Sequence, residues 1–157
     1  MFLARFALGY LALYAAYAAL PDATLQALIH AVIAVPAAVL LDTFAPGEAV
    51  RALHGSLVSP RATLEIVRGC DGAGAAFLLT AAIAAFPSSG TRKLQGVALG
   101  LALLYLINEI RIIGLYGVVA YHYDWFAILH GYFVPLAVIG AAAAFFTWWT
   151  LPRAARA

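Results

Sequence analysis

The sequence predicts an all-α integral membrane protein, built as one bundle of about five transmembrane helices. Of its 157 residues, 66% are hydrophobic and 10% are charged, whereas a soluble domain is about half apolar and a quarter charged. The apolar residues also gather in five long runs separated by polar or proline-containing breaks. The net charge of +2, with no basic run, argues against a nucleic-acid partner. The expected partner is the lipid bilayer.

A single transmembrane domain is expected over residues 1–157. Its expected spans are residues 2–20, 25–41, 72–86, 94–121 and 130–149. The first run is about long enough to cross a hydrocarbon core, and Pro36 is expected to kink the second. In the fourth span, Gly96 and Gly100 form a small-xxx-small pair that lets a neighbouring helix approach closely.

Residues 42–69 carry many of the charged side chains, so this segment is expected to lie outside the membrane. Within it, residues 56–61 and 62–67 form two short extended pieces around a Ser-Pro turn. In the second piece Leu64 and Ile66 fall on one side, and Thr63, Glu65 and Val67 fall on the other. The pattern predicts a small hairpin that leads to Cys70.

Orientation is not decided by counting positive charges, because four stand on each side of the predicted bundle. Arg92 and Lys93 lie directly at a span end, as do Arg153 and Arg156 of a basic tail. We therefore expect these four to face the cytoplasm. The protein is then a multi-pass protein of the plasma (inner) membrane, with residues 42–69 on the extracytoplasmic side.

Cys70 is the only cysteine, which excludes an internal disulfide and a cysteine-rich metal site. No two histidines stand at the i, i+4 spacing of a helical zinc motif. We therefore expect no metal and no cofactor. Glycines flank Cys70 on both sides, so the backbone there can bend freely.

The fourth predicted span contains Asn108, Glu109 and Arg111 within an apolar helix. Charged groups at such a depth cost about 2.5–3.5 kcal/mol each on insertion. Asn108 and Arg111 are three residues apart and share a face, whereas Glu109 and Arg111 do not face each other. Arg111 therefore needs a partner from another helix or from a substrate.

Cys70, Arg111 and His130 are all expected to project towards one side of the bundle. An imidazole can take the proton of a thiol and later protonate a leaving amine. A fixed cation lowers the pKa of a thiol and can hold an oxyanion. The three residues thus predict an acyl-transfer site. Structural alternatives stay open: a packed thiol, an interfacial histidine, and an ion pair of Arg111 with Glu65, Asp71 or Asp124.

Three motifs resemble the exosortase/archaeosortase family. Cys70-Asp71-Gly72 opens a span, Asn108-Glu109-Ile110-Arg111-Ile112 lies within a later span, and His130 opens the next. The resemblance covers roughly residues 66–140. It implies a membrane cysteine protease or transpeptidase acting on membrane-anchored proteins whose C-terminal sorting signal combines a short motif, a hydrophobic helix and a basic tail.

The resemblance also implies residue roles. Cys70 would attack the backbone carbonyl at the motif and form a thioester, with Arg111 and His130 as the other active-site members. Asn108 would orient Arg111, and Glu109 and Asp71 are further candidates for binding or orienting the substrate. The site would face the outer side of the membrane. The substrate motif and the acceptor stay open, because many members are longer and have more spans before the cysteine.

Two other classes of function stay open at this point. A small transporter or channel subunit would line a polar path with Arg111 and Glu109, and its flux would depend on Arg111 but not on Cys70. A non-catalytic assembly protein would use the same buried charges to bind a partner helix.

Overall fold

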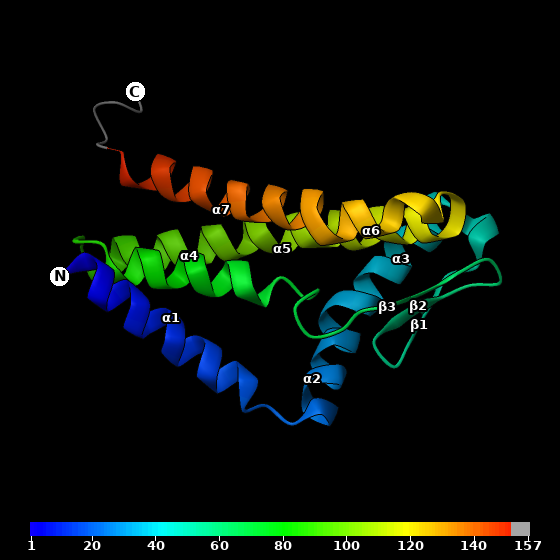
Figure 1. Cartoon of the computed structure of the whole chain (residues 1–157), viewed down its shortest axis with the longest axis horizontal. Helices are drawn as coiled ribbons and strands as arrows, with labels where there is room; N and C mark the ends of the chain where they lie inside the picture. Colours follow the sequence, from blue (N-terminus) through cyan, green and yellow to red (C-terminus); the bar gives the residue numbers. More distant parts are fainter. Residues whose placement is uncertain (152–157) are drawn as a thin grey trace. The chain divides into compact units, whose positions relative to one another are not determined.

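The computed structural model describes residues 1–151 (Figure 1). The described part is mostly helical and holds one small three-stranded sheet. Its elements in chain order are α1 (Phe2–Ala18), α2 (Asp22–Ile29), η1 (His30–Ala34), α3 (Val35–Phe44), η2 (Pro46–Glu48), β1 (Arg51–Leu53), β2 (Ser56–Val58), β3 (Thr63–Glu65), α4 (Ala73–Ala85), α5 (Gly90–Tyr121), η3 (Tyr123–Trp125), α6 (Phe126–Ile128), η4 (Leu129–Phe133) and α7 (Val134–Thr150).

Three continuous helical segments of the described part are long and apolar enough to cross a membrane. They are Asp22–Phe44, Gly90–Tyr121 and Tyr123–Thr150. The helices Phe2–Ala18 and Ala73–Ala85 are also apolar, but have only 17 and 13 residues. At 1.5 Å per residue they reach about 25 and 20 Å, against a hydrocarbon core of about 30 Å. All five predicted runs are helical; that all five cross the membrane stays a prediction.

The chain divides into two compact units. The first contains Met1–Ala19, Gly72–Tyr105 and the described residues from Leu136 to Leu151; the second contains Leu20–Asp71 and Leu106–Pro135. The long helices α5 and α7 contribute residues to both units.

Helix packing in the first unit depends on two glycines of α5. A Cβ added at Gly96 would overlap the ring of Trp149, and a Cβ at Gly100 would overlap the side chains of Leu79 and Phe145. Only the missing side chains allow these neighbours to approach so closely. The close approach predicted from the glycine spacing is therefore present.

The positive pair at the start of α5 lies in a helix rather than in the predicted turn, since α5 begins at Gly90 and not at residue 94. Arg92 Nη2 donates a hydrogen bond to the Trp149 carbonyl at 2.6 Å, and Lys93 Nζ donates one to the Ala84 carbonyl at 2.6 Å. Both cations thus satisfy carbonyls near helix C-termini, which lack partners within their own helices. The basic tail with Arg153 and Arg156 lies outside the described residues.

The hairpin predicted before Cys70 is present in the second unit. Strands β2 and β3 pair antiparallel with Leu57 opposite Leu64. Leu64 and Ile66 are 6% and 0% exposed, so the predicted alternation does mark the buried face. The sequence did not indicate β1, which pairs with β2 and completes a sheet of order β1-β2-β3.

Two π-helical turns, η1 and η4, precede the prolines of the long helices. The N–H groups of Val35 and Val134 donate to the carbonyls five residues earlier, His30 and Leu129. Each turn comes just before a proline, which has no N–H to offer to the preceding turn, and π-turns in helices often mark functional positions. One of these wide turns carries His130.

Two further helices extend beyond the spans predicted for them. The helix predicted for residues 130–149 begins at Tyr123, because the polar aromatic stretch forms a 3₁₀ turn that continues into the helix. His130 therefore lies inside the helix instead of opening it. The second helix extends from Asp22 to Phe44 instead of covering residues 25–41, so the loop predicted to start at residue 42 starts later.

Candidate functional site

Cys70 lies in a tight turn directly before α4. Its N–H donates to the Val67 carbonyl at 2.9 Å. Gly69 and Gly72 have φ angles of +93° and +79°, a conformation that L side chains rarely adopt. The glycines on either side of the cysteine are thus required by the turn. The turn leaves Cys70 9% exposed.

The thiol meets the imidazole of a residue 60 positions later in the chain. Cys70 Sγ lies 3.7 Å from His130 Nε2. The His130 ring stacks on Phe126 one turn earlier in the helix, with centroids 5.0 Å apart and planes 11° from parallel. This stacking holds the ring so that Nε2 faces the sulfur. The second unit therefore brings together two of the three residues predicted to be catalytic.

Both groups open into a cavity of about 300 Å³, which is at the small end of the range for ligand pockets. One wall is aliphatic and comes from α5, namely Ile112, Leu115 and Val119. The remaining lining residues come from the hairpin, the Cys70 turn and the start of the last helix: Thr63, Leu64, Glu65, Val67, Cys70, Tyr123, Phe126 and His130. A thiol, an imidazole and a carboxylate thus face an otherwise largely apolar space.

Arg111 does not line this cavity, but it acts electrostatically on both Cys70 and His130. Burial raises the pKa of the Cys70 thiol above its ordinary value, and the charge of Asp71 adds to the increase. The Arg111 cation offsets part of this increase. The resting thiol is therefore protonated at neutral pH, so a reaction at sulfur needs a neighbouring base.

Asn108 and Glu109 are buried in α5, at 3% and 4% exposure, and neither lines the cavity. Within residues 1–151, no hydrogen-bond partner reaches the buried atoms Asn108 Oδ1, Arg111 Nε or His130 Nδ1. Buried polar atoms are rarely left without a partner. Three residues predicted for the site thus each have one buried polar atom whose hydrogen-bonding capacity is unused within residues 1–151.

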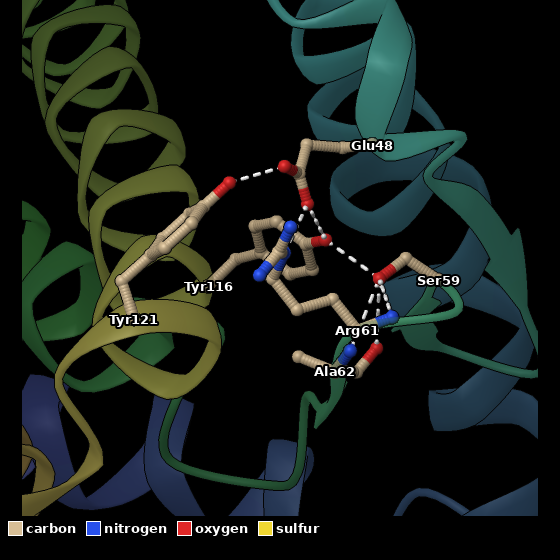
Figure 2. Close-up of polar contacts among 6 residues, drawn as sticks. All are labelled: Glu48, Ser59, Arg61, Ala62, Tyr116 and Tyr121. Carbon is tan, nitrogen blue, oxygen red and sulfur yellow. Dashed lines mark hydrogen bonds and ion pairs between the residues drawn. The ribbon is translucent and has the colours of Figure 1, made fainter.

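Sequence reasoning did not find a polar cluster centred on Glu48 (Figure 2). Tyr121 Oη donates a hydrogen bond to this carboxylate, and Arg61 Nε lies 3.4 Å from its second oxygen. Tyr116 Oη donates to Ser59 Oγ at 2.8 Å. The hydrogen bond from Tyr121, followed by the Arg61 charge, lowers the pKa of Glu48 below its ordinary value. The cluster joins the hairpin tip and the η2 turn to the end of α5.

No family model, no curated protein and no solved structure matches this chain. The described residues hold no group of three or more histidine, cysteine, aspartate or glutamate side chains that could bind a metal ion. Any assignment of function therefore rests on the motifs and on the geometry of the Cys70 site.

Replacing Arg111 with glutamine is expected to shift the alkylation of Cys70 by iodoacetamide to higher pH. Only the thiolate reacts, and loss of a cation that stabilises it raises the pKa of the thiol. Second-order rate constants measured across alkaline pH, with the adduct located by mass spectrometry, test this. Arg51→Gln is the matched control, because this exposed arginine of β1 is not among the charges that act on Cys70. Identical profiles for Arg111→Gln and the wild type would contradict the role given to Arg111.

Proposed function

We propose that this chain is a membrane-embedded cysteine protease or transpeptidase of the exosortase/archaeosortase kind. The observation that carries the proposal is the 3.7 Å separation of Cys70 Sγ and His130 Nε2 at a shared cavity. This is the nucleophile–base pair that covalent acyl transfer needs. The motifs around Cys70, Arg111 and His130 support the same assignment.

In the proposed first step, Cys70 Sγ attacks a backbone carbonyl carbon of the substrate while its proton passes to His130 Nε2. A neutral imidazole can accept this proton only if its own ring proton is on Nδ1. The negative charge that develops on the carbonyl oxygen is stabilised by the field of Arg111. The C–N bond then breaks, and the imidazolium returns its proton to the leaving amine. The product is a thioester on Cys70.

In the second step, water or an amine attacks the thioester, and His130 takes the proton of the incoming nucleophile. The acyl group leaves with that nucleophile, and the thiolate recovers the proton from the imidazolium. Water as acceptor gives cleavage, and an amine gives transfer of the protein to a new anchor. The substrate is proposed to be a membrane-anchored exported protein with a C-terminal sorting signal.

The chain is proposed to be a multi-pass protein of the plasma membrane with the site on the extracytoplasmic side. Three helices long and apolar enough to cross a membrane support the first part. The hairpin segment that precedes Cys70 carries charged side chains such as Glu48, Arg61 and Glu65, which favour an aqueous environment. That segment supplies one side of the site.

The proposal is tested by capturing the acyl-enzyme. The tagged full-length chain, expressed in a host together with a membrane protein bearing a tripartite C-terminal signal, is denatured rapidly and separated without reductant. We expect a covalent adduct of the two proteins that hydroxylamine releases, because hydroxylamine cleaves thioesters. Mass spectrometry should locate the modification on Cys70.

Three outcomes distinguish this proposal from the other classes of function. A folded protein that forms no such adduct, although iodoacetamide reacts with its Cys70, would contradict the proposal. A transporter would instead show flux that depends on Arg111 and not on Cys70. In an assembly protein, the mutation of Arg111 would dissociate a complex.

A further inference from the structure

Strand β3 lies at the edge of the sheet, beside the candidate nucleophile. The sheet order β1-β2-β3 gives β3 a partner on one side only. All three of its residues, Thr63, Leu64 and Glu65, line the cavity that holds Cys70 and His130. An unpaired strand edge presents a row of N–H and C=O groups that can pair with another extended chain.

The register shows which backbone groups face outward. Ser59 N–H donates to the Ala62 carbonyl at 2.9 Å, and Ile66 N–H donates to the Gly55 carbonyl at 3.2 Å. Directly paired residues of an antiparallel ladder alternate between bonded and non-bonded pairs. Leu64, two residues from each of these bonded positions and opposite Leu57, therefore faces β2.

It follows that Thr63 and Glu65 direct their backbone N–H and C=O groups away from β2, towards the free edge. Both residues are exposed. Among the described residues, no partner strand covers this edge. Backbone groups of this kind are strong hydrogen-bonding groups that normally find a partner.

We propose that β3 binds the substrate as an added fourth strand, which rests on the proposed function. An extended peptide pairs with the outward groups of Thr63 and Glu65, and this pairing carries one of its carbonyl carbons to Cys70 Sγ. Main-chain pairing provides the affinity in such strand addition, and alternate side chains enter pockets. The aliphatic wall of the cavity, from α5, receives those side chains. The substrate class is therefore an unfolded, extended segment rather than a helix.

A backbone N-methyl scan tests this with the unmodified protein. The probes are biotinylated pentapeptide chloromethyl ketones of alanine, each with one amide N-methylated, and the readout is the rate at which Cys70 Sγ displaces chloride. Strand addition uses every second N–H of the peptide. We expect N-methylation at alternate positions to slow labelling by about tenfold, as for a lost hydrogen bond that leaves its partner unsatisfied. The intervening positions should change the rate by less than about twofold.

Proline variants test the protein side of the same contact. Thr63→Pro removes one outward N–H from β3, and we expect about tenfold slower peptide labelling with an unchanged iodoacetamide rate. Ala52→Pro is the matched control. Ala52 pairs with Leu57 of β2, and the backbone N–H and C=O groups of Leu57 face β3. Ala52 therefore directs its own N–H and C=O groups to the opposite edge of the sheet, away from the cavity. The peptides should label Cys70 of the Ala52→Pro variant at the wild-type rate. Edge strands tolerate proline at such positions.

The outcomes separate this inference from the proposed function. If Cys70 reacts with the peptides at rates that do not alternate with N-methyl position, strand addition is overturned while the peptidase proposal stands. Equal slowing by Thr63→Pro and Ala52→Pro also overturns it. If no peptide labels Cys70 in protein that iodoacetamide does modify, the proposed function fails and the inference fails with it. Should Thr63→Pro not fold, the N-methyl scan decides alone.

Discussion

Cys70→Ala is expected to abolish processing of a co-expressed protein bearing the C-terminal signal, with a fall in rate of roughly 10³-fold or more. The reason is that the chain holds a single cysteine, so no other thiol can form the thioester. The His130 imidazole has no sulfur and cannot form this thioester in place of Cys70. The time course of the size change of the substrate on immunoblots measures the effect.

Cys70→Ser provides the matched control for this loss, because it keeps nearly the same shape in the turn between Val67 and Gly72. It should fold with a melting temperature close to that of the wild type in detergent and still process poorly, since a hydroxyl is a weaker nucleophile than a thiol. Normal processing by a folded Cys70→Ala protein would end the proposal of cysteine catalysis.

His130→Gln is expected to lower the rate of processing by about 10²–10⁴-fold, the usual contribution of a positioned general acid–base. The thiol has a raised pKa and is protonated at neutral pH. In the proposed mechanism it therefore depends on the imidazole for activation. Glutamine fills similar space next to Phe126, but cannot take a proton. Initial rates of processing at several pH values, at matched expression, measure the loss.

The control for this variant is His122→Gln, in the exposed break between α5 and η3. His122 does not line the cavity. Its replacement by glutamine should therefore leave the rate of substrate processing unchanged. A His130→Gln protein that processes as fast as His122→Gln would show that the contact with Cys70 has no role in activation.

The helices were predictable because a long apolar run in a chain with a membrane protein's composition has few alternatives to a helix. A helix pairs all the backbone N–H and C=O groups of such a run within the run itself. Their ends were less predictable. Tyr123-Asp124-Trp125 has the composition of an interfacial turn, yet it forms the first turn of the last helix. Polar residues are acceptable at a helix start as well as in a loop, so composition does not separate the two.

The sheet shows where local pattern is enough and where it is not. The alternation of Leu64 and Ile66 around a Ser-Pro turn predicts the β2–β3 hairpin from adjacent residues. Strand β1 is three residues long and carries no alternation of its own. It exists through its pairing with β2, a contact that no pattern within Arg51–Leu53 encodes.

In the candidate site, too, some contacts could be predicted from the sequence and others could not. The residue types of Cys70, Arg111 and His130 pointed to acyl-transfer chemistry, and the structure places the first and last in contact. Their catalytic roles stay predictions. The Glu48 cluster could not be predicted, because its partners Tyr116 and Tyr121 lie 68 and 73 residues away in the chain. Each is an ordinary polar residue until the fold brings them together.

The Glu48 cluster has a consequence for the extracytoplasmic position proposed for the hairpin, because the surroundings there are not buffered by the cell. The pKa of this carboxyl is lowered, so its contribution to holding the hairpin is present above the ordinary glutamate pKa and is lost only as the pH falls through the lowered value. Mild acidification of the medium therefore leaves intact the contacts of Glu48 that hold the hairpin of β2 and β3 against α5. The proposed peptide-binding edge would then stay in place when the medium outside the cell becomes mildly acidic.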